Sequence, residues 1–105
     1  RSQKKDFEKM KLVVWSKASS DSLQYIYDYI LNEAKSPQNV EMVVLTLLKL
    51  GNELNIFPEK FPKEPTFNDE SIRFCVKWNF KILYQIKHDK ILIINVYSTK
   101  MSFFK

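Results

Sequence analysis

Residues 72–98 of the chain read IRFCVKWNFKILYQIKHDKILIINVYS, and this stretch decides the fold. Apolar and polar side chains alternate through much of it with a period of two, which is typical of β-strands. The alternation breaks at residues 77–79 and again at His88 and Asp89, where polar residues suit turns. We therefore predict three consecutive antiparallel strands in the C-terminal third of the chain.

The N-terminal third predicts one strand followed by one helix. Residues 11–15 (KLVVW) are rich in β-branched and aromatic side chains, which favour a short strand. Residues 16–21 (SKASSD) suit a helix start, and we expect Ser19 or Ser20 to be the N-cap. The apolar residues that follow recur at helical spacing: Leu23, Ile26, Tyr27, Ile30 and Ala34.

A second helix is predicted to begin at Ser36 and Pro37, because serine caps helices and proline is tolerated at their first position. Its apolar face is formed by Val40, Val43, Val44, Leu47 and Leu48. Gly51 weakens the helix by up to about 1 kcal/mol. Since Leu54 keeps the helical phase, we expect the helix to continue to Asn55.

The segment between the helices and the strands is predicted to be a long loop, because residues 57–70 hold three of the four prolines. The order of elements is therefore β-α-α-β-β-β, an α+β fold. We expect an antiparallel two-helix hairpin packed on a mainly antiparallel four-stranded sheet, which the N-terminal strand joins. One domain is expected over residues 1–105, with residues 1–10 as an N-terminal extension.

The charge of the chain is unevenly distributed. The net charge is +5, and residues 72–105 hold seven Lys or Arg against the single acid Asp89. A sheet built from these residues carries a positive field that favours an acidic partner or a polyanion.

The composition also narrows the chemistry. One cysteine, Cys75, and one histidine, His88, cannot supply the three or four ligands of a zinc site, and we expect neither metal nor cofactor. A lone cysteine suits a reducing compartment, no apolar run is long enough to cross a membrane, and the first residues (RSQKK) do not resemble a signal peptide. We therefore expect a cytoplasmic protein.

The order of these elements resembles the RelE/ParE toxin superfamily, and the ParE branch more than the RelE branch. The resemblance spans residues 11 to about 100. Its main features are the first helix with Tyr29 and Ile30, the end of the second helix (LNIFP, residues 54–58), Ile72 and Arg73, the strand FKILY (residues 80–84) and the apolar strand at residues 91–96.

The resemblance implies the toxin of a type II toxin–antitoxin, or plasmid stabilisation, system that inhibits growth until a cognate antitoxin binds it. Members of the ParE branch bind DNA gyrase, and no cleavage chemistry is established in the toxin. Members of the RelE branch cleave mRNA on the ribosome. A third alternative is a non-toxic module that only binds an antitoxin. DNA binding is expected only through the antitoxin.

For a ribonuclease, the candidate catalytic residues are Arg73, Lys77, Lys81 and Lys100. Cleavage by 2′-hydroxyl attack needs a base, an acid and charge stabilisation around one phosphate. We expect the first three residues to share the strand face that alternates with the apolar positions. Arg73 and Lys81 match basic positions of the nuclease branch.

Other positions depart from the nuclease pattern. Cys75 stands where that branch has a basic residue. The C-terminal tail holds Phe103 and Phe104 where that branch has an acid–base group, and phenylalanine cannot transfer a proton. The acid–base role is therefore left empty unless Tyr97 or another group fills it. His88 is expected to be an ordinary turn residue and Cys75 an unreactive one. Trp15 and Trp78 are expected in the core rather than stacked on bases. The ParE-like, non-enzymatic reading is therefore favoured, and the ribonuclease remains the alternative.

Overall fold

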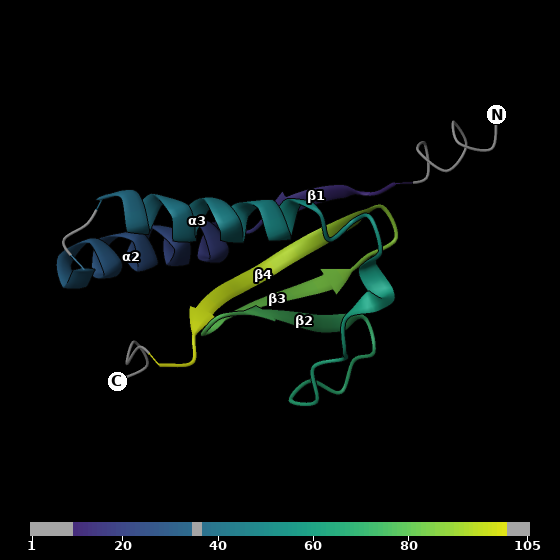
Figure 1. Cartoon of the computed structure of the whole chain (residues 1–105). Coiled ribbons are helices and arrows are strands. Elements are labelled where there is room, and N and C mark those ends of the chain that lie inside the picture. The colour runs from purple at the N-terminus through teal and green to yellow at the C-terminus, as the bar shows by residue number, and fades with distance from the viewer. Residues whose placement is uncertain (1–9, 35–36, 101–105) are drawn as a thin grey trace.

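The computed structural model describes residues 10–34 and 37–100. Its elements in chain order are β1 (Leu12–Trp15), α2 (Lys17–Ala34), α3 (Pro37–Asn52), the short 3₁₀ turn η1 (Pro58–Lys60), β2 (Ile72–Lys77), β3 (Phe80–Ile86) and β4 (Lys90–Ser98). The two helices lie side by side, and the sheet lies beneath them (Figure 1). The predicted β-α-α-β-β-β order and the α+β class are confirmed.

The sheet is mixed, with the strand order β1-β4-β3-β2. Strand β1 pairs in parallel with β4, whereas β3 pairs antiparallel with both β4 and β2. The first strand of the chain therefore lies beside the last one. The helical hairpin is the crossover that carries the chain from β1 to β2, which runs parallel to β1 and β4.

Helix α2 begins earlier than the sequence pattern predicted. The cap is Ser16 rather than Ser19 or Ser20, since the Ser16 hydroxyl accepts a hydrogen bond from the backbone N–H of Ser19 at 3.0 Å. The same hydroxyl donates to the carbonyl of Ile94 at 2.8 Å. Ile94 lies at a register shift, because Leu83 pairs with Asn95 but Tyr84 pairs with Ile93. A bulge in β4, invisible in the local sequence, thus fixes where the helix starts.

Helix α3 begins at Pro37 as predicted but ends at Asn52, not at Asn55. Beyond it the chain tightens into turns, in which Leu54 donates its N–H to the carbonyl of Gly51 at 3.1 Å. Gly51 lies inside the helix, and a Cβ built there would lie 2.4 Å from the Trp15 ring. The glycine therefore allows α3 to approach β1.

The sheet has two unlike faces. The helix face packs its central residues against α2 and α3, and its fully buried members are Ile82, Tyr84, Ile91, Ile93 and Val96. The opposite face, here called the open face, is partly covered by the loop before β2. This loop pairs with β2 through the backbone. The N–H of Glu64 donates to the carbonyl of Ile72 at 2.9 Å, and the N–H of Phe74 donates to the carbonyl of Pro62 at 3.1 Å.

Within the described residues, none of the helices has the length and apolar character needed to cross a membrane. The N-terminal extension expected over residues 1–10 lies, apart from Met10, outside the described part of the chain.

Candidate functional site

The basic candidates do not share one face of the sheet, and that prediction was wrong. The two-residue turn at Trp78 and Asn79 pairs Lys77 with Phe80, so that Arg73 lies opposite Tyr84 on the helix face. Lys81 pairs with Val76 and therefore lies on the open face. The apolar alternation was read correctly in each strand, but the pairing across the turn reverses which face β2 presents.

Lys81 forms a buried ion pair with Glu64, which comes from the loop before β2. Its Nζ lies 2.6 Å from Glu64 Oε1, and only 20% of the lysine side chain and 4% of the glutamate side chain are exposed. The Thr66 hydroxyl donates to the other carboxylate oxygen at 2.6 Å. The hydrogen bond from Lys81, followed by that from Thr66, lowers the pKa of Glu64 to about 2.

The charge of Lys81 is held in place by its surroundings. Burial acts to lower the pKa of Lys81, but the hydrogen bond to Glu64 and the proximity of Tyr97 outweigh it and raise that pKa overall. The ammonium group also lies 4.4 Å from the centre of the Phe74 ring and 5.9 Å from that of Tyr97. Lys81 therefore remains protonated and already has an anionic partner, so it cannot act as a general base.

A pocket of about 490 Å³ opens beside this ion pair. The residues that line it come from the loop and from β3 and β4: Glu64, Thr66, Phe67, Leu83, Ile94, Asn95 and Tyr97. The carboxylate of Glu64 is the charged group of this lining, and the Lys81 ammonium balances its charge, so the pocket offers a phosphate no net attraction. The pocket therefore suits an uncharged or apolar group better than a nucleotide.

Arg73, on the helix face of the sheet, binds the backbone of the loop before β2. Its Nη1 donates to the carbonyl of Phe61 at 2.6 Å and to that of Glu59 at 3.3 Å. Nearby, the hydroxyl of Tyr84 donates to the carbonyl of Pro58 at 2.6 Å, and burial raises the pKa of this phenol. Arg73 is thus committed to backbone carbonyls of the chain and lies across the sheet from Lys81.

The remaining predicted candidates lie near one end of the sheet. Lys77 is exposed, with its Nζ 5.0 Å from the centre of the Trp78 ring. Lys100 is also exposed, and its N–H donates to the Ser98 hydroxyl at 3.0 Å. Trp78 is not a core residue, because it lies in the β2–β3 turn and 49% of its surface is exposed.

The other residues weighed from the sequence take structural positions. His88 is exposed in the β3–β4 turn, and Trp15 is half-buried with its Nε1 donating to Asn52 Oδ1 at 2.8 Å. Cys75 is buried at 3% exposure, and burial raises the pKa of its thiol to about 11. Phe103 and Phe104 lie outside the described residues. Among the residues that are described, no three of the His, Cys, Asp and Glu side chains come close enough to hold a metal ion.

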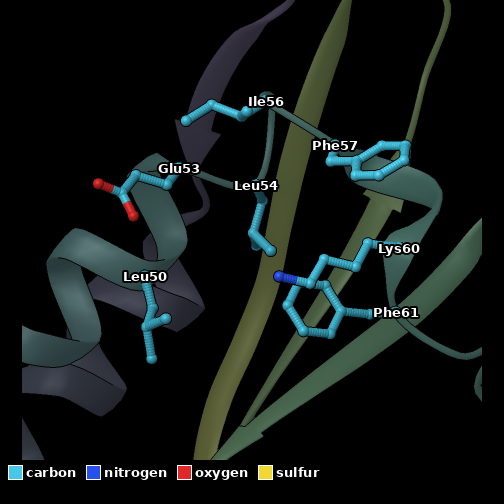
Figure 2. A pocket seen from close by; sticks show the side chains of 7 residues that line it. All are labelled: Leu50, Glu53, Leu54, Ile56, Phe57, Lys60 and Phe61. Atoms are coloured by element: carbon cyan, nitrogen blue, oxygen red, sulfur yellow. The ribbon is translucent and has the colours of Figure 1, made fainter.

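A second, apolar groove lies between the end of α3 and the segment that carries η1, with a volume of about 250 Å³. Figure 2 shows the seven residues that line it, which are Leu50, Glu53, Leu54, Ile56, Phe57, Lys60 and Phe61. Ile56 is 64% exposed and Phe57 is 65% exposed. Glu53 and Lys60 supply one charge of each sign. The volume of the groove lies below the roughly 300–1,000 Å³ of small-molecule sites. The groove therefore suits side chains of a protein partner.

Glu64 is the residue of this region that the sequence did not single out. It lies between Lys63 and Pro65 in a loop that also holds Glu59, Asp69 and Glu70. Acids in such a loop are usually solvated, and no periodicity marks the one that becomes buried. Only the fold brings Glu64 to Lys81, which lies 17 residues further along the chain.

Comparison with known proteins agrees with this architecture. Residues 13–103 match the family described as the ParE toxin of type II toxin-antitoxin system, parDE. A structure of the chromosomal ParDE TA system from P. aeruginosa superimposes with a TM-score of 0.72 at 17% identity, covering 87% of this chain and 98% of that chain. The RelBE2 toxin-antitoxin complex from Mycobacterium tuberculosis gives 0.60 at 15% identity, covering 89% and 98%.

No curated protein sequence matches the chain. At identities of 17% and 15%, the two solved structures establish the fold alone. The family match is broader evidence, because it covers nearly the whole chain, from β1 to beyond β4. The chain therefore belongs to the ParE toxin family of type II toxin–antitoxin systems.

Proposed function

We propose that this protein is the toxin of a type II toxin–antitoxin pair that acts in the bacterial cytoplasm by binding DNA gyrase. In this account it inhibits growth through surface contact and carries out no cleavage itself. A cognate antitoxin neutralises it, and any contact with DNA is made by the antitoxin. The proposal follows the ParE family membership for the target and the site geometry for the absence of cleavage.

The separation of the basic candidates is the observation that carries the proposal. RNA cleavage needs a base, an acid and charge stabilisation around one phosphate. Here the Lys81 ammonium is 2.6 Å from Glu64, whereas Arg73 binds backbone carbonyls on the other face of the sheet. A phosphate at Lys81 would have to displace a buried carboxylate, which opposes binding. The geometry therefore favours inhibition by binding over catalysis.

The apolar groove at the end of α3 is the surface that we assign to the antitoxin. Ile56 and Phe57 leave most of their surface exposed beside the groove. Such exposed apolar groups at a concave site are typical of protein interfaces, and an amphipathic segment can place apolar side chains there. Lys60 at the rim, 5.3 Å from the centre of the Phe61 ring, suits an acidic residue of that segment.

A ribosome-dependent ribonuclease remains the second candidate because of one observation. Tyr97 lines the 490 Å³ pocket on the open face, and Lys81 lies beside it. A phenol next to an ammonium group is a pair that can transfer a proton and stabilise a phosphate. In this second account Glu64 would have to leave when RNA enters.

The proposal is tested with purified toxin, bacterial DNA gyrase and the product of the small reading frame adjacent to the toxin gene. We expect the toxin to inhibit supercoiling and the antitoxin to restore it. The variant Phe57→Asp should still inhibit gyrase but require at least about tenfold more antitoxin, because it places a charge beside the groove. Leu45→Asp, an equally exposed position on α3 outside the groove, is the control.

Two results would contradict the proposal. If gyrase stays active at toxin concentrations far above those of the enzyme, the target is wrong. If Phe57→Asp and Leu45→Asp respond alike to the antitoxin, the groove is not its binding site. A protein that binds the antitoxin but neither stops growth nor inhibits gyrase would be the non-toxic module.

A further inference from the structure

The turn between β2 and β3 forms a tip at one end of the sheet with Val76, Lys77 and Trp78. Lys100, just beyond the end of β4, belongs to the same end. Val76 is 54% exposed and Trp78 is 49% exposed. Thr99 holds the two parts together, because its N–H donates to the carbonyl of Asn79 at 2.8 Å. We call these four residues the tip surface. It combines two exposed apolar side chains with two lysines around the end of the sheet, with Val76 on the open face and Lys77 on the helix face.

The backbone at this tip is held in an unfavourable conformation. Trp78 has φ of 55°, which makes it the one non-glycine residue with positive φ in the described part of the chain. The left-handed region suits glycine and asparagine, whereas a bulky side chain is disfavoured there. Asparagine is present at the next position, Asn79, so the turn carries its largest side chain at its least suitable backbone position. Strain of this kind is concentrated at functional sites.

Packing within the chain does not explain the tryptophan. Half of its surface remains exposed, and its ring contacts Lys77 of the same turn, whose Nζ lies 5.0 Å from the ring centre. Tryptophan is one of the side chains enriched among the residues that contribute most to binding in protein interfaces.

The charge of the tip surface defines its partner. Lys77 and Lys100 are both exposed. The single acid in residues 72–105, Asp89, lies in the β3–β4 turn at the far end of the seven-residue strand β3, which is about 20 Å away. The tip therefore presents positive charge without a neighbouring acid from its own sheet. An opposing surface with carboxylates would be attracted to it.

We propose that the tip surface is the part of the toxin that contacts its target protein, with Trp78 entering an apolar pocket whose rim carries carboxylates. This inference rests on the proposed function, in which the toxin acts by binding. A nucleic acid is the less suitable partner. Tracking a phosphate backbone takes a row of cations, whereas the tip has two, and Val76 adds apolar surface that a phosphate backbone would not cover.

The test uses the full-length toxin and the variants Trp78→Asn, Lys77→Gln and Leu45→Gln. Trp78→Asn suits the positive φ, so its melting temperature should equal or exceed that of the unaltered protein. If the inference is right, the same variant raises the concentration for half-inhibition of gyrase supercoiling by at least tenfold. Lys77→Gln should raise it about threefold and weaken its salt dependence. Leu45→Gln, which removes a similarly exposed apolar residue from α3, should change nothing.

The outcomes separate the inference from the proposed target. If gyrase is inhibited equally by the unaltered toxin and by Trp78→Asn, the inference is wrong and the target stands. If gyrase is not inhibited but growth arrest is lost in Trp78→Asn alone, the target is wrong and the inference stands. If the unaltered toxin causes neither effect, both are overturned. If Trp78→Asn instead loses binding to a fluorescent single-stranded oligonucleotide while gyrase inhibition is unchanged, the tip is a nucleic-acid contact and the inference is wrong.

Discussion

Lys81 and Glu64 form the ion pair that joins the loop before β2 to the centre of the open face, with 2.6 Å between Nζ and Oε1. The glutamate side of this contact is almost fully buried, since only 4% of the Glu64 side chain is exposed to solvent. The pair holds the loop against the sheet. It also neutralises Lys81, a cation that a phosphate at the centre of this face could have used.

Replacing Glu64 by glutamine should destabilise the protein. The substitution keeps the shape of the side chain but leaves the Lys81 ammonium without its anion. The Lys81 side chain is only 20% exposed. Breaking a buried pair costs several kcal/mol, and partial exposure reduces this to about 1–3 kcal/mol. Urea unfolding measures the change. Glu70→Gln is the control, because Glu70 pairs with Lys63 but its side chain is 87% exposed, so a loss below about 0.5 kcal/mol is expected. Equal losses in the two variants would show that the buried pair adds nothing.

The same pair predicts how stability depends on pH. The pKa of Glu64 is lowered from 4.5 to about 2 in the folded protein, chiefly by the hydrogen bond from Lys81. The unfolded chain therefore binds the proton more readily, so the contribution is complete above about pH 5 and is lost as the pH falls toward 2. Between pH 6 and pH 3 the unaltered protein should lose about 1–2 kcal/mol more than Glu64→Gln does. Parallel pH profiles of the two proteins would contradict this assignment.

Replacing Gly51 by alanine should destabilise the protein although alanine favours helices. The helical preference is worth about 1 kcal/mol. Against it, the new Cβ would lie 2.4 Å from Cζ2 of Trp15 and 2.9 Å from Cδ1 of Ile93. Overpacking costs about 1–3 kcal/mol, and a Cβ this close to a rigid ring places the cost in the upper part of that range. Less the helical gain, a net loss of about 1–2 kcal/mol is expected. In a double-mutant cycle, Trp15→Phe should recover at least about 1 kcal/mol of it. Additive effects would mean that the ring is not the obstacle.

The thiol of Cys75 should be almost unreactive in the folded protein. It is 3% exposed, and burial raises its pKa to about 11, so little thiolate exists at neutral pH. At pH 8 we expect modification by a disulfide reagent to be at least about 100-fold slower in buffer than in 8 M urea. Comparable rates in the two solutions would place this cysteine at an accessible position and contradict the helix-face packing of β2.

The fold was predictable because its signals are local. The period of two in residues 72–98 and the apolar spacing in α2 and α3 each arise from side chains within one element, and their order leaves few packings. The boundaries were less predictable. Ser16 rather than Ser19 caps α2 because the carbonyl of Ile94 lies beside it, and α3 ends at Asn52 although Leu54 remains buried. Both depend on contacts with distant residues.

The basic residues of the candidate site could be predicted individually from the sequence, but their positions relative to one another could not. Arg73, Lys77 and Lys81 were recognisable as cations on strands, yet the turn at Trp78 and Asn79 decides which of them share a face. Alternation within a strand carries no information about the register of the next. Glu64 had no local signal at all, and the positive φ of Trp78 could not be inferred from a residue that normally avoids it.

The most direct test of the account is primer extension on a reporter mRNA during induced expression of the toxin, of Lys81→Ala and of Arg73→Ala, with gyrase supercoiling measured on the purified proteins. The account predicts growth arrest with intact mRNA and inhibited supercoiling in the unaltered toxin, and no cleavage signal in either variant. Codon-spaced cuts in the mRNA that disappear in Lys81→Ala, with supercoiling unaffected, would contradict it and identify the protein as a ribonuclease.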